Sequence, residues 1–121
     1  MAAPINVFKS FTKDLTTTTI ALDEADTLVY TAPGNNTAIV LMAQIANTGT
    51  NTINATFSLV KSGPSITPLV SSFPIPESDS LDVLSGKLIV EEGQQLHVNF
   101  DDDSSGRAGS ITISVLESRN A

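Results

Sequence analysis

The chain has 121 residues, which is enough for one domain and too few for two. It contains no cysteine and one histidine, so disulfides, thiolate metal sites and histidine-rich metal clusters are excluded. The net charge of −7 at pH 7 argues against non-specific binding to duplex DNA. No stretch approaches the roughly 20 apolar residues of a transmembrane helix, and the N-terminus lacks the features of a secretory signal. We therefore expect a soluble chain made in a cytoplasm.

The composition favours β-structure. Ser and Thr number 14 each, and Ile and Val add 10 and 9; Thr, Val and Ile fit the pleated, half-buried surface of a sheet. In the first half of the chain, period-two patterns between turn residues predict strands over residues 5–12, 16–22, 27–31, 37–47 and 52–61. The strand over 37–47 is apolar on both faces and is expected at the centre of a sheet. We expect it to form a hairpin with 52–61.

In the second half, the same pattern predicts strands over residues 69–76, 80–84, 87–90, 95–100 and 109–117. Pro74 and Pro76 lack a backbone donor, so the first of these strands is expected at an edge or a crossing. Alternation assigns one set of side chains to the core: Ile53, Ala55, Phe57, Leu59, Leu96, Val98, Phe100, Ile111, Ile113 and Val115.

These patterns predict an all-β fold, an antiparallel β-sandwich of about 8–10 short strands with no significant helix. Both a jelly-roll and an immunoglobulin-like strand order are compatible with the sequence. Residues 1–12 are expected to form an N-terminal arm or an ordinary first strand, and residues 13–121 a single sandwich domain.

The loop over residues 101–106 is the sharpest local feature. Asp101, Asp103 and Ser105 alternate before a glycine, as in a calcium-binding loop, but the position of the bidentate Glu falls within a predicted strand. We therefore interpret the segment as a solvated acidic turn and keep these three residues as a weak Ca²⁺ candidate only. No other metal site and no cofactor is predicted.

No catalytic constellation is predicted either. His97 alternates with core residues, so we expect it on the solvent-facing side of its strand beside Gln95 and Asn99, where no nucleophile accompanies it. The acidic residues near Glu91 and Glu92 lie in turns, and aromatic residues that would bind a sugar are scarce. The basic residues are scattered, which argues against nucleic-acid binding. The sequence thus predicts a protein that is not an enzyme.

A surface rich in Ser, Thr, Asn and Gln, with β-edges at both termini, is typical of an assembly subunit. Beyond this, the chain resembles small β-sandwich virion structural proteins of tailed bacteriophages over residues 27–118. The resemblance is carried by strand and turn segments: VYTAPGNNTAIVL at 29–41, QIAN at 44–47, FPIP at 73–76, SLDVL at 80–84, GKLIVEEGQQLHV at 86–98 and ISVLE at 113–117.

The resemblance implies a virion location, no catalytic residues, and a role as a capsid decoration (cement) protein that binds the outer face of the major capsid protein lattice as a dimer or trimer. The acidic charge favours this outer location over a DNA-lined interior. A neck, tail or baseplate subunit is the alternative, and a carbohydrate-binding module is a third hypothesis. Deletion of residues 1–11 is expected to abolish lattice binding and to leave the domain folded. The candidate contact residues are Ile5, Val7, Phe8, Phe11, Ile66, Asp102 and Arg107.

Overall fold

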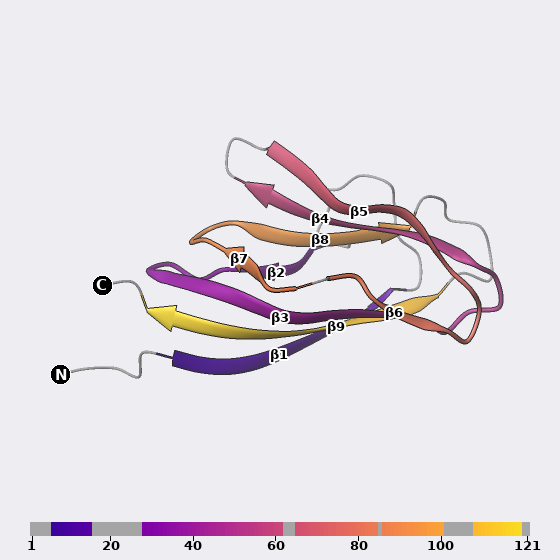
Figure 1. The fold of residues 1–121 in the computed structure, drawn as a ribbon, viewed down its shortest axis with the longest axis horizontal. Coiled ribbons are helices and arrows are strands. Elements are labelled where there is room, and N and C mark those ends of the chain that lie inside the picture. Colours follow the sequence, from indigo (N-terminus) through magenta and orange to yellow (C-terminus); the bar gives the residue numbers. More distant parts are fainter. Residues whose placement is uncertain (1–5, 16–27, 62–64, 85, 101–107, 120–121) are drawn as a thin grey trace.

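The computed structural model describes residues 6–15, 28–61, 65–84, 86–100 and 108–119. Within these ranges the chain forms nine strands and no helix. The described residues therefore include no helix that could cross a membrane. The strands are β1 (Asn6–Leu15), β2 (Leu28–Thr31), β3 (Asn36–Asn47), β4 (Ile53–Lys61), β5 (Ser65–Ile75), β6 (Ser80–Asp82), β7 (Leu88–Val90), β8 (Gln95–Phe100) and β9 (Gly109–Arg119) (Figure 1). The expected strand over 16–22 lies outside the described residues.

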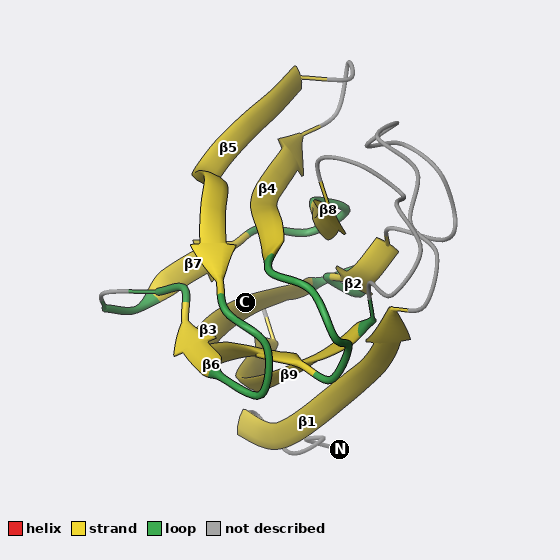
Figure 2. Ribbon diagram, turned by 90° about the vertical axis from the view of Figure 1, so that its right-hand side faces the viewer, coloured by secondary structure: helices red, strands yellow, loops and turns green. Residues whose placement is uncertain are grey.

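The strands form two antiparallel sheets that pack face to face (Figure 2). One sheet has the order β1-β9-β3-β6, with β7 also paired to β3, and the other has the order β2-β8-β4-β5. The pairs β1–β9, β2–β8, β3–β6/β7 and β4–β5 are nested, as if one long hairpin had been folded back on itself. This order confirms the β-sandwich and identifies it as a jelly roll.

The core lies between the two sheets and contains the side chains that alternation assigned to it. Phe57 and Phe100 are its largest fully buried residues, from β4 and β8, and Ile111, Ile113 and Val115 of β9 face them from the other sheet. Because each strand places every second side chain on one face, the polar residues between these positions fall outside the core.

The predicted hairpin of residues 37–47 with 52–61 is wrong. β3 pairs with β9, β6 and β7 in one sheet, whereas β4 pairs with β5 and β8 in the other. The short segment between them carries the chain across the sandwich, and Asn47 holds this crossing in place. Its side-chain Nδ2 donates to the Asn51 and Ile75 carbonyls, both at 2.8 Å, and its Oδ1 accepts the Gly49 N–H at 2.9 Å. Turn composition between two strands thus did not distinguish a hairpin from a crossing.

The expectation of β-edges at both termini is half right. β1 is an edge strand, but the C-terminal β9 lies between β1 and β3 in the interior of its sheet. β5 forms an edge of the other sheet, in line with its prolines, and its register against β4 shifts twice near Ser72, which has a positive φ of 51°.

Candidate assembly surface

A row of apolar side chains crosses the outer face of the sheet that contains β1. Phe8 of β1 lies opposite Leu116 of β9, Leu116 lies opposite Ile39 of β3, and Ile39 lies opposite Ile89 of β7. Ile39, Ile89 and Leu116 are each next in sequence to a core residue, so their side chains point outward. Phe8 lies on the same face because it is directly opposite Leu116. Cross-strand neighbours on one face contact each other, and the row is therefore continuous.

A bulge in β3 adds a fifth apolar residue. The register between β3 and β9 shifts between Val40 and Met42, which makes Leu41 an extra residue of the strand and leaves it 37% exposed. Phe8 is 74% exposed and Ile89 is 59% exposed. We call Phe8, Ile39, Leu41, Ile89 and Leu116 the outer-face patch.

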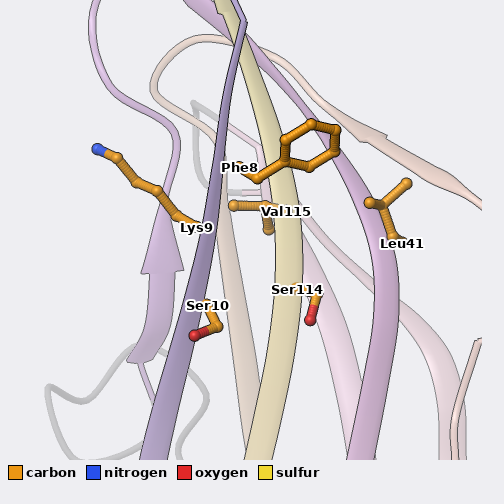
Figure 3. A pocket seen from close by; sticks show the side chains of 6 residues that line it. All are labelled: Phe8, Lys9, Ser10, Leu41, Ser114 and Val115. Carbon is orange, nitrogen blue, oxygen red and sulfur yellow. The ribbon is translucent and has the colours of Figure 1, made fainter.

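An open depression of about 350 Å³ lies within this patch. Figure 3 shows the ring of Phe8 on one side of it and Leu41 on the other. The other lining residues are Lys9, Ser10, Ser114 and Val115. The depression is shallow, whereas a small-molecule pocket usually encloses its ligand. The depression could accommodate one protruding side chain of a partner protein.

Apart from Met42 and Ala46 of β3, which lie opposite Ser114 and Ser110, the remainder of this face is polar. Successive rows place Ser10 opposite Ser114 and Thr12 opposite Thr112, and the exposed carboxylates of Asp14 and Asp82 lie further along the same face. An apolar cluster bordered by small polar side chains is the composition expected of a protein–protein contact surface.

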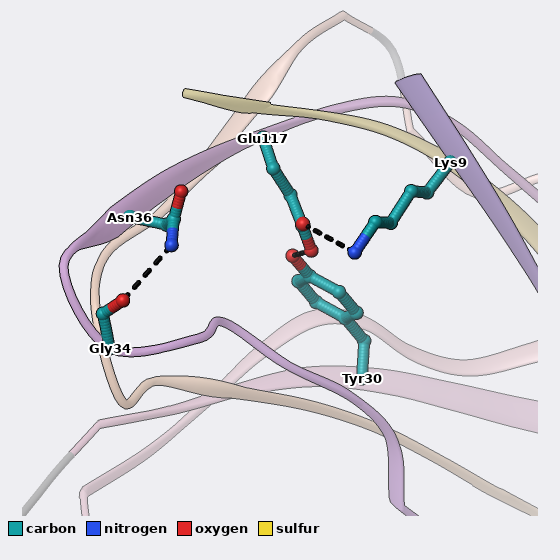
Figure 4. Close-up of polar contacts among 5 residues, drawn as sticks. All are labelled: Lys9, Tyr30, Gly34, Asn36 and Glu117. Carbon is teal, nitrogen blue, oxygen red and sulfur yellow. Dashed lines mark hydrogen bonds and ion pairs between the residues drawn. The ribbon is translucent and has the colours of Figure 1, made fainter. Parts of the chain in front are cut away.

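A buried polar cluster holds β1 against the sandwich (Figure 4). Glu117 of β9 is 5% exposed; its Oε1 lies 3.0 Å from Lys9 Nζ, and its Oε2 accepts a 2.5 Å hydrogen bond from the Tyr30 hydroxyl. Burial raises the pKa of Tyr30 well above its usual value, and the hydrogen bond to the Glu117 carboxylate and its negative charge raise it further. Phe11 packs on the ring of Tyr30 with centroids 5.0 Å apart. The cluster therefore joins β1, β9 and β2, and so links the two sheets.

The predicted contact residues separate in space. Val7 and Phe8 lie on the exposed half of β1, whereas Phe11 is partly buried against the core. Ile66 is 42% exposed on β5, in the other sheet. Ile5, Asp102 and Arg107, and the weak Ca²⁺ candidates Asp101, Asp103 and Ser105, lie outside the described residues.

Four members of the outer-face patch were not predicted from the sequence: Ile39, Leu41, Ile89 and Leu116. The signal was present in part, since β3 is apolar on both faces and a central strand covered on one face only must expose the other set. Which strands lie beside β3 depends on the sheet order, and this order brings the four residues to Phe8.

The expectation that His97 faces solvent is wrong: it is 2% exposed. The outward side of β4 and β8 is buried as well as the core side, and it carries Thr56, Ser58, His97 and Asn99. His97 Nε2 lies 3.0 Å from Gln95 Oε1. Although Ser58 lies opposite His97 in the register, its Oγ is buried without a hydrogen-bond partner, so these residues form no nucleophile–base pair. Among the described residues, no group of three or more His, Asp or Glu side chains is arranged to hold a metal.

Neither a protein-family model nor a curated protein sequence matches the chain. Solved structures do match it in fold. One is a chain of the cyanophage Pam1 capsid asymmetric unit, with 20% identity, coverage of 98% of this chain and 92% of that chain, and a TM-score of 0.55. Another comes from Bacillus endospore appendages, described as disulfide-linked pili, with 11% identity, coverage of 99% and 93%, and a TM-score of 0.54. The fold is thus shared with structural proteins of a capsid and of a pilus.

Proposed function

We propose that this chain is a capsid decoration (cement) protein of a tailed bacteriophage. It binds the outer face of the major capsid protein lattice through the outer-face patch and stabilises the head. The observation that carries the proposal is the patch itself: five apolar side chains form a continuous cluster on a sheet face whose other residues are mostly polar. A surface of this kind is stabilised when a partner removes it from water.

The fold likeness to a chain of a cyanophage capsid supports this proposal, because the match extends over nearly the whole of both chains. The likeness to a pilus protein is compatible with a chain that assembles repetitively. That pilus family is described as disulfide-linked, whereas the 121 residues of this chain contain no cysteine that could form such a link. The net charge of −7 also fits a subunit that lies outside the DNA-filled shell.

The first test is the copy number of the chain in purified particles of the phage that encodes it. Quantitative mass spectrometry against the major capsid protein is expected to give a ratio of about one third or more, because a lattice-bound protein occupies sites that repeat over the whole shell. A far smaller ratio would transfer the chain to the neck, tail or baseplate. Absence from the particle would overturn the virion proposal.

The second test concerns the surface. Phe8→Ser is expected to weaken binding to particles assembled without the chain by about tenfold or more, because truncation of an aromatic hot-spot residue at an interface costs about 2 kcal/mol or more. Ile66→Ser is the matched control, since Ile66 is an exposed apolar residue on the opposite sheet. Equal loss of binding by both variants would contradict the assignment of the surface. These substitutions are preferable to the deletion of residues 1–11, which also removes Phe11 and the Lys9–Glu117 ion pair.

A further inference from the structure

The edge strands of the two sheets differ in how well they are protected against pairing with another chain. β5 contains Pro68 and Pro74 and two register shifts, β2 has four residues and one shift, and β6 and β7 have three residues each. β1, in contrast, has ten residues, no proline, and an unbroken register with β9 over its whole length. Prolines, bulges and short length block the other edges, and β1 has none of them. Charged side chains also protect edges, and β1 carries Lys9, Lys13 and Asp14, of which Lys9 is paired with Glu117 of its own chain.

The N-terminal half of β1 is also bare on both faces. Residues 6–10 are all exposed, with Val7 at 38% and Phe8 at 74% although the two side chains point to opposite faces. Among the described strands, β1 pairs with β9 alone. Every second residue of such an edge turns its N–H and C=O groups away from its neighbour, and these groups are available to a further strand.

We propose that two copies of this chain pair through β1. The strands run antiparallel about a two-fold axis perpendicular to the sheet, and Ser10 of one copy lies opposite Ser10 of the other. The pairing itself does not depend on the proposed virion function.

The charges on β1 and the length of the paired strand together select this register. A two-fold axis perpendicular to the sheet leaves the outer faces of both copies on the same side. Residues paired across the axis must therefore both point outward or both point inward. An axis at Ser10 places Phe8 opposite Thr12, Asn6 opposite Asp14, and Lys9 opposite Phe11, and no like charges meet. An axis at Lys9 sets Lys9 against itself, and an axis at Phe11 sets Lys9 against Lys13. Like charges directly opposite each other are destabilising in a sheet. Axes at Phe8 and Thr12 also keep like charges apart, but they pair only residues 6–10 and 9–15 of β1, whereas the axis at Ser10 pairs residues 6–14.

The consequence for binding follows from the same axis. This axis joins the β1-containing sheets of the two copies into one continuous sheet and places both outer-face patches on the same side. If the chain binds a lattice as proposed above, the dimer presents two anchors at a fixed spacing, and the second contact forms at a high effective concentration.

The test uses the absence of cysteine from the chain. In the proposed dimer, directly opposite Cα atoms are about 4.5–5.5 Å apart, which is within disulfide range. Ser10→Cys is therefore expected to form an intermolecular disulfide under mild oxidation. Thr12→Cys is the matched control. Its two copies lie roughly 13 Å apart along the strands, and the disulfide is expected to form at least about tenfold more slowly than with Ser10→Cys. An equimolar mixture of Phe8→Cys and Thr12→Cys is expected to cross-link, since these positions face each other.

Sedimentation velocity over a concentration series supplies the second readout. The unmodified chain is expected to form a dimer, and Ser10→Lys is expected to raise its dissociation constant up to about fivefold, because the new charges meet on the axis. Ser10 and Thr12 are both exposed, so substitutions at these two positions do not disturb the core. A chain that stays monomeric, a trimer, or equal cross-linking of the Ser10→Cys and Thr12→Cys variants would overturn the proposal.

Discussion

Tyr30 joins the two sheets through a single hydrogen bond to the buried Glu117 carboxylate. Tyr30→Phe removes this bond to a charged acceptor, and we expect the free energy of unfolding at pH 7 to fall by about 1.5–3 kcal/mol. The raised pKa of Tyr30 adds a pH dependence. The folded protein holds the phenolic proton more tightly than the unfolded chain does, so this contribution is complete below the usual tyrosine pKa of roughly 10 and is lost as the pH rises above it.

Urea unfolding of both proteins at neutral pH and at about pH 10.5 checks this expectation. The difference in unfolding free energy between the unmodified chain and Tyr30→Phe should shrink at the alkaline pH. Comparing the two proteins at each pH isolates the contribution of the Tyr30 hydroxyl. A difference that stays constant with pH would show that the Tyr30 proton is not linked to folding.

Gly109 lies where β9 begins, and its backbone approaches two neighbours closely. A Cβ atom at this position would lie 2.8 Å from the Ala46 carbonyl oxygen and 3.1 Å from Phe100 Cζ. The carbonyl belongs to β3 and cannot move without disturbing the β3–β9 pairing, so Gly109→Ala is expected to destabilise the fold by about 1–3 kcal/mol. Gly34→Ala is the control, since its Cβ would meet only Glu92 Oε2 at 3.8 Å. Equal melting temperatures for the two variants would contradict this account.

Asn47 acts at the scale of elements, because it fixes the crossing from one sheet to the other. Its Nδ2 lies between two carbonyl oxygens, and its Oδ1 accepts a backbone N–H. Asn47→Asp places a carboxylate oxygen where both neighbours are acceptors, so we expect it to destabilise the fold more than Asn47→Ala, which loses about 1–3 kcal/mol. Chemical denaturation at pH 7 measures the order of the two variants. The reverse order would mean that the side chain does not hold the crossing through its amide group.

The strands themselves were predictable from alternation, and their partners were not. Ile53 to Leu59 and Leu96 to Phe100 fall into the core as the period-two pattern indicates, because that pattern depends only on local geometry. Pairing depends on contacts far apart in sequence, such as β1 with β9, and the turn residues after β3 carry no such information. His97 shows the same limit: alternation placed it correctly outside the core but did not reveal that this second face is buried too.

At the scale of the whole molecule, the candidate surface became visible only from the sheet order. Phe8 was a candidate from its sequence, yet its neighbours in the outer-face patch come from β3, β7 and β9, more than 30 positions away. A jelly roll interleaves its first and last strands, so residues from both ends of the chain share one face.

The nature of this surface predicts how binding responds to salt. If the acidic chain docked on a capsid by charge attraction, a rise in ionic strength from about 0.1 to about 1 M would shorten the Debye length from roughly 10 to 3 Å and weaken binding about tenfold or more. The outer-face patch is apolar, and its exposed acidic neighbours, Asp14 and Asp82, lie further along the sheet. We therefore expect the affinity for particles assembled without the chain to change less than about threefold in NaCl, and to increase in sulfate, which strengthens apolar burial. Phe8→Ser should bind more weakly at every salt concentration. Loss of binding in high NaCl with no effect of Phe8→Ser would assign docking to the charged surface instead.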